Sequence, residues 1–149
     1  MREVVFALEF RGRAGPMPGT DTRRRARTTA PSQVLRTALG TAGVESAVES
    51  IAGDHAVLES EVESLGDGAF TEWGSIRYGS AGSVTFETVG QGILAPPAAP
   101  GVRSGAVIWK VTGGDGRFAG AQGLIVSNFT VSPEGLVTDN HFARLYLPS

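Results

Sequence analysis

The chain has 149 residues, with 13 basic and 15 acidic side chains, 21 glycines, 8 prolines and no cysteine. A chain of this length buries enough surface for one hydrophobic core, so we expect residues 1–149 to form a single domain. The lack of cysteine excludes a disulfide framework, a thiol nucleophile and a thiolate metal site. Neither a signal-peptide pattern nor an apolar run of transmembrane length is present, so we expect a cytoplasmic protein without a membrane partner.

The positive charge is concentrated near the start of the chain. Residues 1–40 contain eight arginines and three acids, whereas residues 41–149 contain five basic and twelve acidic residues. The densest cluster is Arg23-Arg24-Arg25-Ala26-Arg27. It lacks the interleaved aromatic residues that stack on bases, so we expect no nucleic-acid partner. A loop facing solvent or another subunit is the preferred interpretation, and binding of an anionic ligand or partner is the alternative.

The first predicted element is a strand over residues 4–11, where Phe6, Leu8 and Phe10 alternate onto one face. The glycines and prolines of residues 12–19 then predict a loop. Residues 20–43 are ambiguous. The spacing of Val34, Leu35, Ala38 and Leu39, between Pro31 and Gly40, predicts a short helix, and an extended segment is the alternative.

Seven more strands are predicted where residues rich in Val, Thr, Ile and aromatic side chains alternate with glycine-containing turns. They cover approximately residues 44–51, 55–65, 70–78, 83–94, 103–112, 121–131 and 136–147. The predicted fold is therefore all-β, an eight-stranded antiparallel up-and-down β-barrel with a short helix or long loop between strands 1 and 2. A β-sandwich is the competing architecture.

The glycine-rich segment between the last predicted strands carries a resemblance to a known family. Its sequence is Trp109-Lys110-Val111-Thr112-Gly113-Gly114-Asp115-Gly116-Arg117-Phe118-Ala119-Gly120-Ala121-Gln122-Gly123, followed by the strand Leu124–Val131. This pattern resembles the characteristic hairpin of the allene-oxide-cyclase-like and dirigent-like β-barrel superfamily. It looks most similar to the uncharacterised bacterial members. A phosphate-binding loop is disfavoured, because no helix N-terminus follows the glycines.

The resemblance implies a function class as well as a fold. Members with known activity bind hydrophobic, flexible molecules and direct a cyclisation or isomerisation without a cofactor. The resemblance therefore implies a barrel that binds a hydrophobic small molecule such as a polyketide, lipid or terpenoid, and that acts on it as a cofactor-independent cyclase or isomerase. The alternative is a non-catalytic ligand-binding or structural barrel resembling dirigent proteins. The resemblance also implies a homodimer or homotrimer.

Three polar residues are the catalytic candidates. Glu72 shares a strand face with Phe70, Ile76 and Tyr78, and a carboxyl group among apolar neighbours can work as an acid or base. Alternation in the last strand places His141 on the face of Leu145. Asn128 is the third candidate, as a group that orients a ligand carbonyl or a water. The competing interpretations are a rim position for Glu72, a structural role for His141 and a backbone contact for Asn128.

Aromatic residues spread over several strands are the candidate walls of the cavity. The predicted ligand-binding residues are Trp73, Trp109, Phe129 and Phe86. The alternating Glu59, Glu61 and Glu63 predict an acidic outer wall, because three like charges inside a barrel would repel each other. Two histidines in distant segments and no cysteine give no metal-binding pattern, so no metal site is expected. The resemblance to the superfamily implies that no cofactor is needed.

Overall fold

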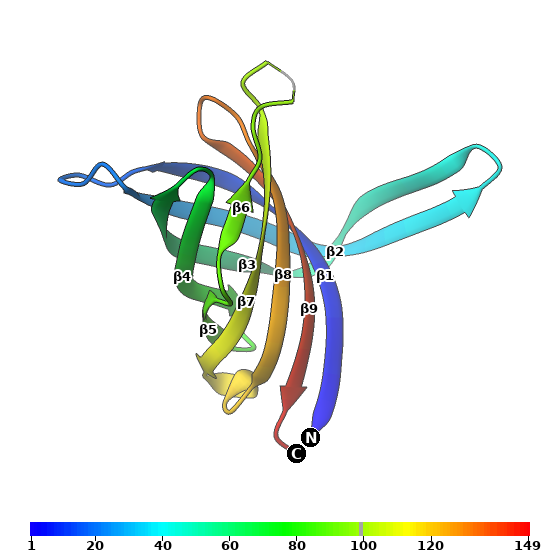
Figure 1. Ribbon diagram of the computed structural model, residues 1–149. Coiled ribbons are helices and arrows are strands. Elements are labelled where there is room, and N and C mark those ends of the chain that lie inside the picture. Colours follow the sequence, from blue (N-terminus) through cyan, green and yellow to red (C-terminus); the bar gives the residue numbers. More distant parts are fainter. Residues whose placement is uncertain (99) are drawn as a thin grey trace.

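The computed structural model describes residues 1–98 and 100–149. Over these residues the chain forms nine β-strands and one short 3-10 helix (Figure 1). They are β1 (Arg2–Pro16), β2 (Arg23–Gly40), β3 (Gly43–Gly66), β4 (Ala69–Tyr78), β5 (Ser83–Thr88), β6 (Gly92–Leu94), β7 (Arg103–Gly114), η1 (Gly116–Phe118), β8 (Gln122–Val131) and β9 (Leu136–Leu147). All of the strand pairings are antiparallel. The all-β, antiparallel prediction is confirmed.

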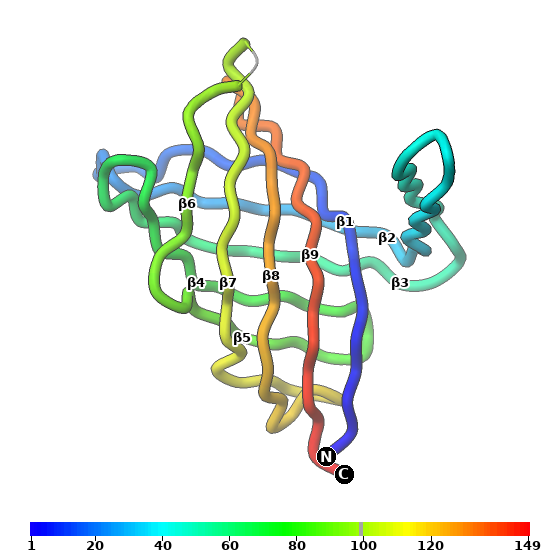
Figure 2. Tube along the Cα trace, turned by 45° about the vertical axis from the view of Figure 1, so that its right-hand side comes forward, coloured from blue at the N-terminus to red at the C-terminus, as the bar shows by residue number. Residues whose placement is uncertain are grey.

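The strands form one sheet that closes on itself. Its order is β3-β2-β1-β9-β8-β7-β5-β4-β6, and additional pairings join β3 to β4 and β7 to β6. Hydrogen bonding can therefore be followed around a complete, barrel-like ring (Figure 2). The first and last strands lie side by side from Arg2↔Leu147 to Arg13↔Leu136, so both termini lie at the same end of the ring.

The predicted short helix or long loop between the first two strands is wrong, because residues 23–40 form the long strand β2. From Arg24 to Thr29 this strand pairs with β1, and along most of its length it pairs with β3. The spacing of Val34, Leu35, Ala38 and Leu39 fits one helix face, but Leu35 and Leu39 also fit the period of a strand. Pairing with residues 43–50 selects the strand.

The predicted number of strands also differs from the structure. The predicted strands 44–51 and 55–65 are two parts of the continuous strand β3, so the glycine-containing segment between them is not a turn. The predicted strand 83–94 is divided into β5 and β6. With β2 added, the described residues contain nine strands rather than eight.

A two-stranded arm projects from the ring (Figure 1). We define it as residues 33–40 of β2 and 43–50 of β3, which pair with one another beyond a bulge between Pro31 and Gln33. One face of the arm carries the exposed apolar side chains Leu35, Leu39, Val44 and Val48, and Leu39 is 83% exposed. At its base, the side chain of Gln33 accepts a hydrogen bond from the backbone N–H of Glu9 and donates one to the carbonyl of Glu9.

The inward side chains divide the interior into a filled end and an open end. Near the termini, Tyr78 packs edge-on against Phe6 and also contacts Phe118 of η1. The middle is filled by fully buried residues that include Phe10, Trp109, Ile125 and Leu145. Gly116 of η1 has φ +56° and lies against the carbonyl of Ala81, so a glycine is required at this turn. A cavity remains at the opposite end.

The arm contributes little to the stability of the ring, which leads to a testable expectation. Replacing Thr37–Ser46 by Asn-Gly joins Arg36 to Ala47 through a two-residue turn. Hydrogen-bonded and non-hydrogen-bonded pairs alternate along an antiparallel ladder, and Arg36↔Ala47 is the same type of pair as Gly40↔Gly43, which closes the native turn. Because no residue of the core is touched, we expect the Tm to change by less than about 4 °C, measured by circular dichroism. A shortened protein that no longer unfolds cooperatively would contradict this expectation.

The matched control is Gln33→Ala at the base of the arm. This substitution removes the two hydrogen bonds with Glu9. It should lower the free energy of unfolding by about 1–2 kcal/mol, more than removal of the outer arm. Comparing the two variants distinguishes the stability contributed by the hydrogen bonds at the base of the arm from that contributed by its outer residues.

Candidate functional site

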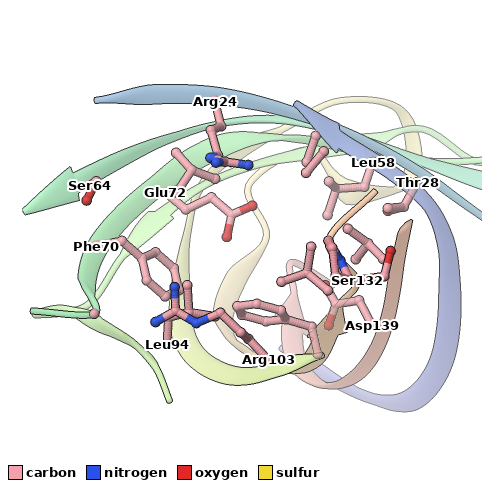
Figure 3. A pocket seen from close by; sticks show the side chains of 18 of the residues that line it. Arg24, Thr28, Leu58, Ser64, Phe70, Glu72, Leu94, Arg103, Ser132 and Asp139 are labelled. Carbon is pink, nitrogen blue, oxygen red and sulfur yellow. The ribbon is translucent and has the colours of Figure 1, made fainter. Parts of the chain in front are cut away.

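A cavity of about 420 Å³ opens at the end of the ring opposite the termini (Figure 3). This volume is within the range of small-molecule sites, about 300–1,000 Å³. Its apolar walls include Leu58, Val62, Phe70, Leu94 and Phe129. The polar lining residues are Arg24, Thr28, Ser64, Glu72, Arg103, Ser132 and Asp139. The cavity is thus largely apolar, with a few polar groups that converge on it.

Glu72 lies on β4 with its carboxylate pointing into the cavity (Figure 3). It is 8% exposed, and its Oε1 accepts a hydrogen bond of 2.6 Å from the Ser60 hydroxyl of β3. The Thr88 hydroxyl of β5 both accepts from the backbone N–H of Glu72 and donates to its carbonyl. Strands on both sides of β4 therefore hold this residue in place.

Burial determines the protonation of Glu72. Loss of hydration raises the pKa of its carboxyl group to about 8, and the negative charge of Asp139 acts in the same direction. The hydrogen bond from Ser60 and the nearby indole N–H of Trp109 oppose the rise in pKa but do not cancel it. At neutral pH this carboxyl group keeps its proton and can act as a hydrogen-bond donor or an acid.

Asp139 of β9 is the second carboxylate of the cavity. It is 6% exposed, and its Oδ1 accepts a hydrogen bond of 2.6 Å from the Ser127 hydroxyl. Its Oδ2 lies 2.9 Å from Nε2 of His141. Asp139 and His141 are two residues apart on one strand, so the alternation of β9 directs both inward. The hydroxyl and the imidazole together fix the carboxylate.

The His141 ring lies deeper in the interior than the cavity. It is 2% exposed, stacks on Phe10 at a centroid distance of 4.3 Å and meets Trp109 edge-on at 5.1 Å. Within the described structure, its Nδ1 and the indole Nε1 of Trp109 are buried without a hydrogen-bond partner of normal geometry. A polar atom so placed is a natural contact for a water or a ligand group.

Five of the seven predicted site residues point into the ring. Glu72 and Phe129 line the cavity, and His141, Trp109 and Phe86 form the packed layer of the interior. Trp109 and Phe86 stack on each other at a centroid distance of 4.2 Å. Whether these residues act on a ligand remains a prediction.

The other two predicted site residues, Asn128 and Trp73, do not belong to the cavity. Asn128 is exposed on the outer face of β8, because its neighbour Phe129 points inward and successive strand residues alternate. Trp73 follows Glu72 and lies on the outer face of β4, where the Arg23 guanidinium is 5.5 Å from its ring centroid. The prediction that they face the cavity is wrong, because each is next in sequence to a residue whose side chain faces inward.

Several polar residues of the site were not predicted. Asp139 shares the inward face of β9 with His141, so the same alternation could have identified it. Ser60 and Ser127 could be recognised only as partners of the carboxylates once the strand register is known. Arg24 and Arg103 lie in segments that were interpreted as a loop and as a strand end.

The basic cluster and the acidic strand, which were predicted as separate features, face each other on the outer wall. Cross-strand pairing places Arg23, Arg25 and Arg27 opposite Glu63, Glu61 and Glu59. The closest N···O separations in these three pairs are 2.8, 3.9 and 3.4 Å. The prediction that these glutamates face outward is confirmed, and the arginines pair with them in place of forming a loop.

No protein-family model, curated protein or solved structure matches the chain. The resemblance to the allene-oxide-cyclase-like superfamily thus rests on the glycine-rich segment and stays a prediction. In the described part of the chain, no group of three or more His, Asp or Glu side chains is arranged to hold a metal ion. No described helix is long and apolar enough to span a membrane.

The raised pKa of Glu72 predicts a pH dependence of stability. The folded protein holds this proton up to about pH 8, whereas the unfolded chain releases it near pH 4.5. Stability is therefore greatest below the unfolded pKa and falls as the pH rises towards 8. In Glu72→Gln this loss should be absent, so the Tm difference between variant and native protein should increase in favour of the variant from pH 4.5 to 8. Parallel Tm profiles would contradict the assignment.

Proposed function

We propose that the protein is a small-molecule-binding β-barrel that acts as a cofactor-independent cyclase or isomerase on a hydrophobic substrate. Almost all strands adjacent in the chain are adjacent in the ring, which supports an up-and-down barrel. The observation that carries the proposal is Glu72, a buried carboxyl group with a pKa of about 8 that lines a largely apolar cavity. A group whose pKa lies near neutral pH exchanges protons effectively under physiological conditions.

Glu72 and Asp139 supply the two halves of a proton transfer. Protonated Glu72 donates its proton to the oxygen or carbon on which negative charge develops, and Asp139 accepts a proton from the carbon that loses one. The substrate keeps its molecular formula, as in an isomerisation or cyclisation. The two carboxyl groups exchange protonation states, and solvent at the open mouth restores them.

The apolar walls contribute to the proposed reaction through geometry. Leu58, Phe70 and Phe129 enclose the space next to Glu72. A flexible substrate held there adopts one folded conformer, and exclusion of water strengthens the interaction of the carboxyl groups with developing charge. Ser60 and Ser127 keep the carboxyl groups oriented before the substrate binds.

His141 acts as a positioning residue in this proposal. Its Nε2 is already engaged with Asp139, and its ring stacks on Phe10 and meets Trp109 edge-on. Through the contact with Asp139 it fixes the carboxylate that faces the cavity. Asn128, on the outer face, has no part in the reaction.

The proposed acid–base chemistry can be tested with a model ketone. We expect the native protein to accelerate the exchange of the α-hydrogens of 2-tetralone for deuterium, followed by NMR. Glu72→Gln and Asp139→Asn should each lower the acceleration about 100-fold or more, since each removes one proton-transfer group. The acceleration should also decline above about pH 8, where Glu72 loses its proton.

Asn128→Ala is the matched control, because it removes a polar side chain from the outer face of the ring. This variant should catalyse the hydrogen exchange of 2-tetralone at the native rate. Calorimetry should show that every variant still binds 2-tetralone. If the native protein binds the ketone but exchange is no faster than in buffer, the catalytic proposal is wrong. The protein would then fit the alternative of a non-catalytic ligand-binding barrel.

A further inference from the structure

One arginine of the basic cluster, Arg24, does not take part in the ion pairs of the outer wall. Arg23, Arg25 and Arg27 point outward towards glutamates on β3. Arg24 lies between Arg23 and Arg25 in the sequence, so its side chain is on the other face of β2, where it lines the cavity. Its cross-strand neighbours are Val62 and Pro16, neither of which carries a charge. The strand that neutralises the other three arginines therefore leaves this guanidinium at the mouth of the cavity.

A second arginine lines the same cavity. Arg103 lies at the start of β7, and its Nε donates a hydrogen bond of 3.1 Å to the carbonyl of Ala95. This bond fixes the side chain while the terminal nitrogens of the guanidinium stay available. Figure 3 shows Arg24 and Arg103 on opposite sides of the cavity, with Glu72 between them in this view. Of the three side chains only that of Glu72 is buried.

These two arginines form no ion pair with any described residue, and the other carboxylate of the cavity, Asp139, is held by Ser127 and His141. Neither guanidinium has a carboxylate within ion-pair distance. Glu72 does not serve as the counter-charge, because its carboxyl group is protonated at neutral pH. Two unpaired guanidinium groups at the opening of an apolar cavity form an environment that favours an anion.

We infer that the ligand of this cavity is amphipathic and carries an oxyanion head group, which binds at the mouth between Arg24 and Arg103. Its apolar body lies along Phe70 and Phe129, and its reacting end faces Glu72 and Asp139. The inference rests on the proposed function, since it concerns the same cavity. It adds the charge and the orientation of the ligand, because a head group anchored at the mouth presents the opposite end to the buried carboxyl groups.

A pair of naphthalene probes of equal shape tests this inference. We expect 2-naphthoate to bind at least about 10-fold more tightly than neutral naphthalene-2-carboxamide at low salt, measured by isothermal titration calorimetry. The difference should shrink as the salt concentration rises, because Arg24 is exposed and its charge is screened. Naphthalene-2-sulfonate and 2-naphthyl phosphate, run in parallel, identify which oxyanion the two arginines prefer.

Substitutions assign the preference to individual residues. Arg24→Gln should remove most of the preference for 2-naphthoate while binding of the carboxamide stays unchanged. Arg103→Gln should act in the same way, and Arg103→Lys, which retains the charge, should restore part of the preference. Arg25→Gln is the matched control, because this arginine is adjacent in sequence but faces Glu61 on the outer wall.

The outcomes separate this inference from the proposed function. Equal binding of naphthoate and carboxamide, or an equal loss of both in Arg24→Gln, would overturn the oxyanion site and leave the exchange of 2-tetralone as the test of catalysis. Failure of both probes to bind would contradict the ligand-binding cavity itself, and this inference with it. Loss of the naphthoate preference in Arg25→Gln would show a general effect of positive charge and also overturn the assignment.

Discussion

Closure of an antiparallel sheet imposes one constraint on every strand: each side chain faces either the interior or the solvent, and the next faces the other way. In this protein the ring is completed by the pairing of β3 with β4 and of β1 with β9. The constraint puts Glu72 inside and Trp73 outside, and it divides Arg24 from Arg23 and Arg25. The cavity, its two carboxyl groups and the ion pairs of the outer wall all follow from this alternation.

Both buried carboxyl groups of the interior are stabilised in the same way, by a serine hydroxyl on the neighbouring strand. Glu72 accepts from Ser60, and Asp139 accepts from Ser127, in both cases at 2.6 Å. Each serine lies on the neighbouring strand, two positions from the residue directly opposite the carboxylate. The short diagonal bond offsets part of the cost of burial. The Asp139 carboxylate has a further partner at 2.9 Å, Nε2 of His141, which distinguishes it from Glu72.

Much of the fold could be predicted from the sequence where strand alternation is clear. Phe6, Leu8 and Phe10 identified β1, and the alternation of Glu59, Glu61 and Glu63 identified the outer face of β3. The prediction failed for β2, because Val34, Leu35, Ala38 and Leu39 fit both a helix and a strand. Only the partner strand decides between them, and a pairing across the turn at residues 41–42 is not visible in local spacing. For the site, alternation placed Glu72 and His141 inside, whereas Asn128 and Trp73 were assigned by residue type against the same alternation.

The arm makes β3 a strand with two different environments along its length. From Ala56 to Glu63 it lies between β2 and β4 and belongs to the closed ring. From Val44 to Glu49 its described partner is β2 alone, and a two-stranded ribbon in water is only marginally stable. Its backbone hydrogen bonds there can open without disturbing the core. A single continuous strand thus spans two cooperative units, one that exchanges its amide protons through local fraying and one that exchanges them only when the ring unfolds.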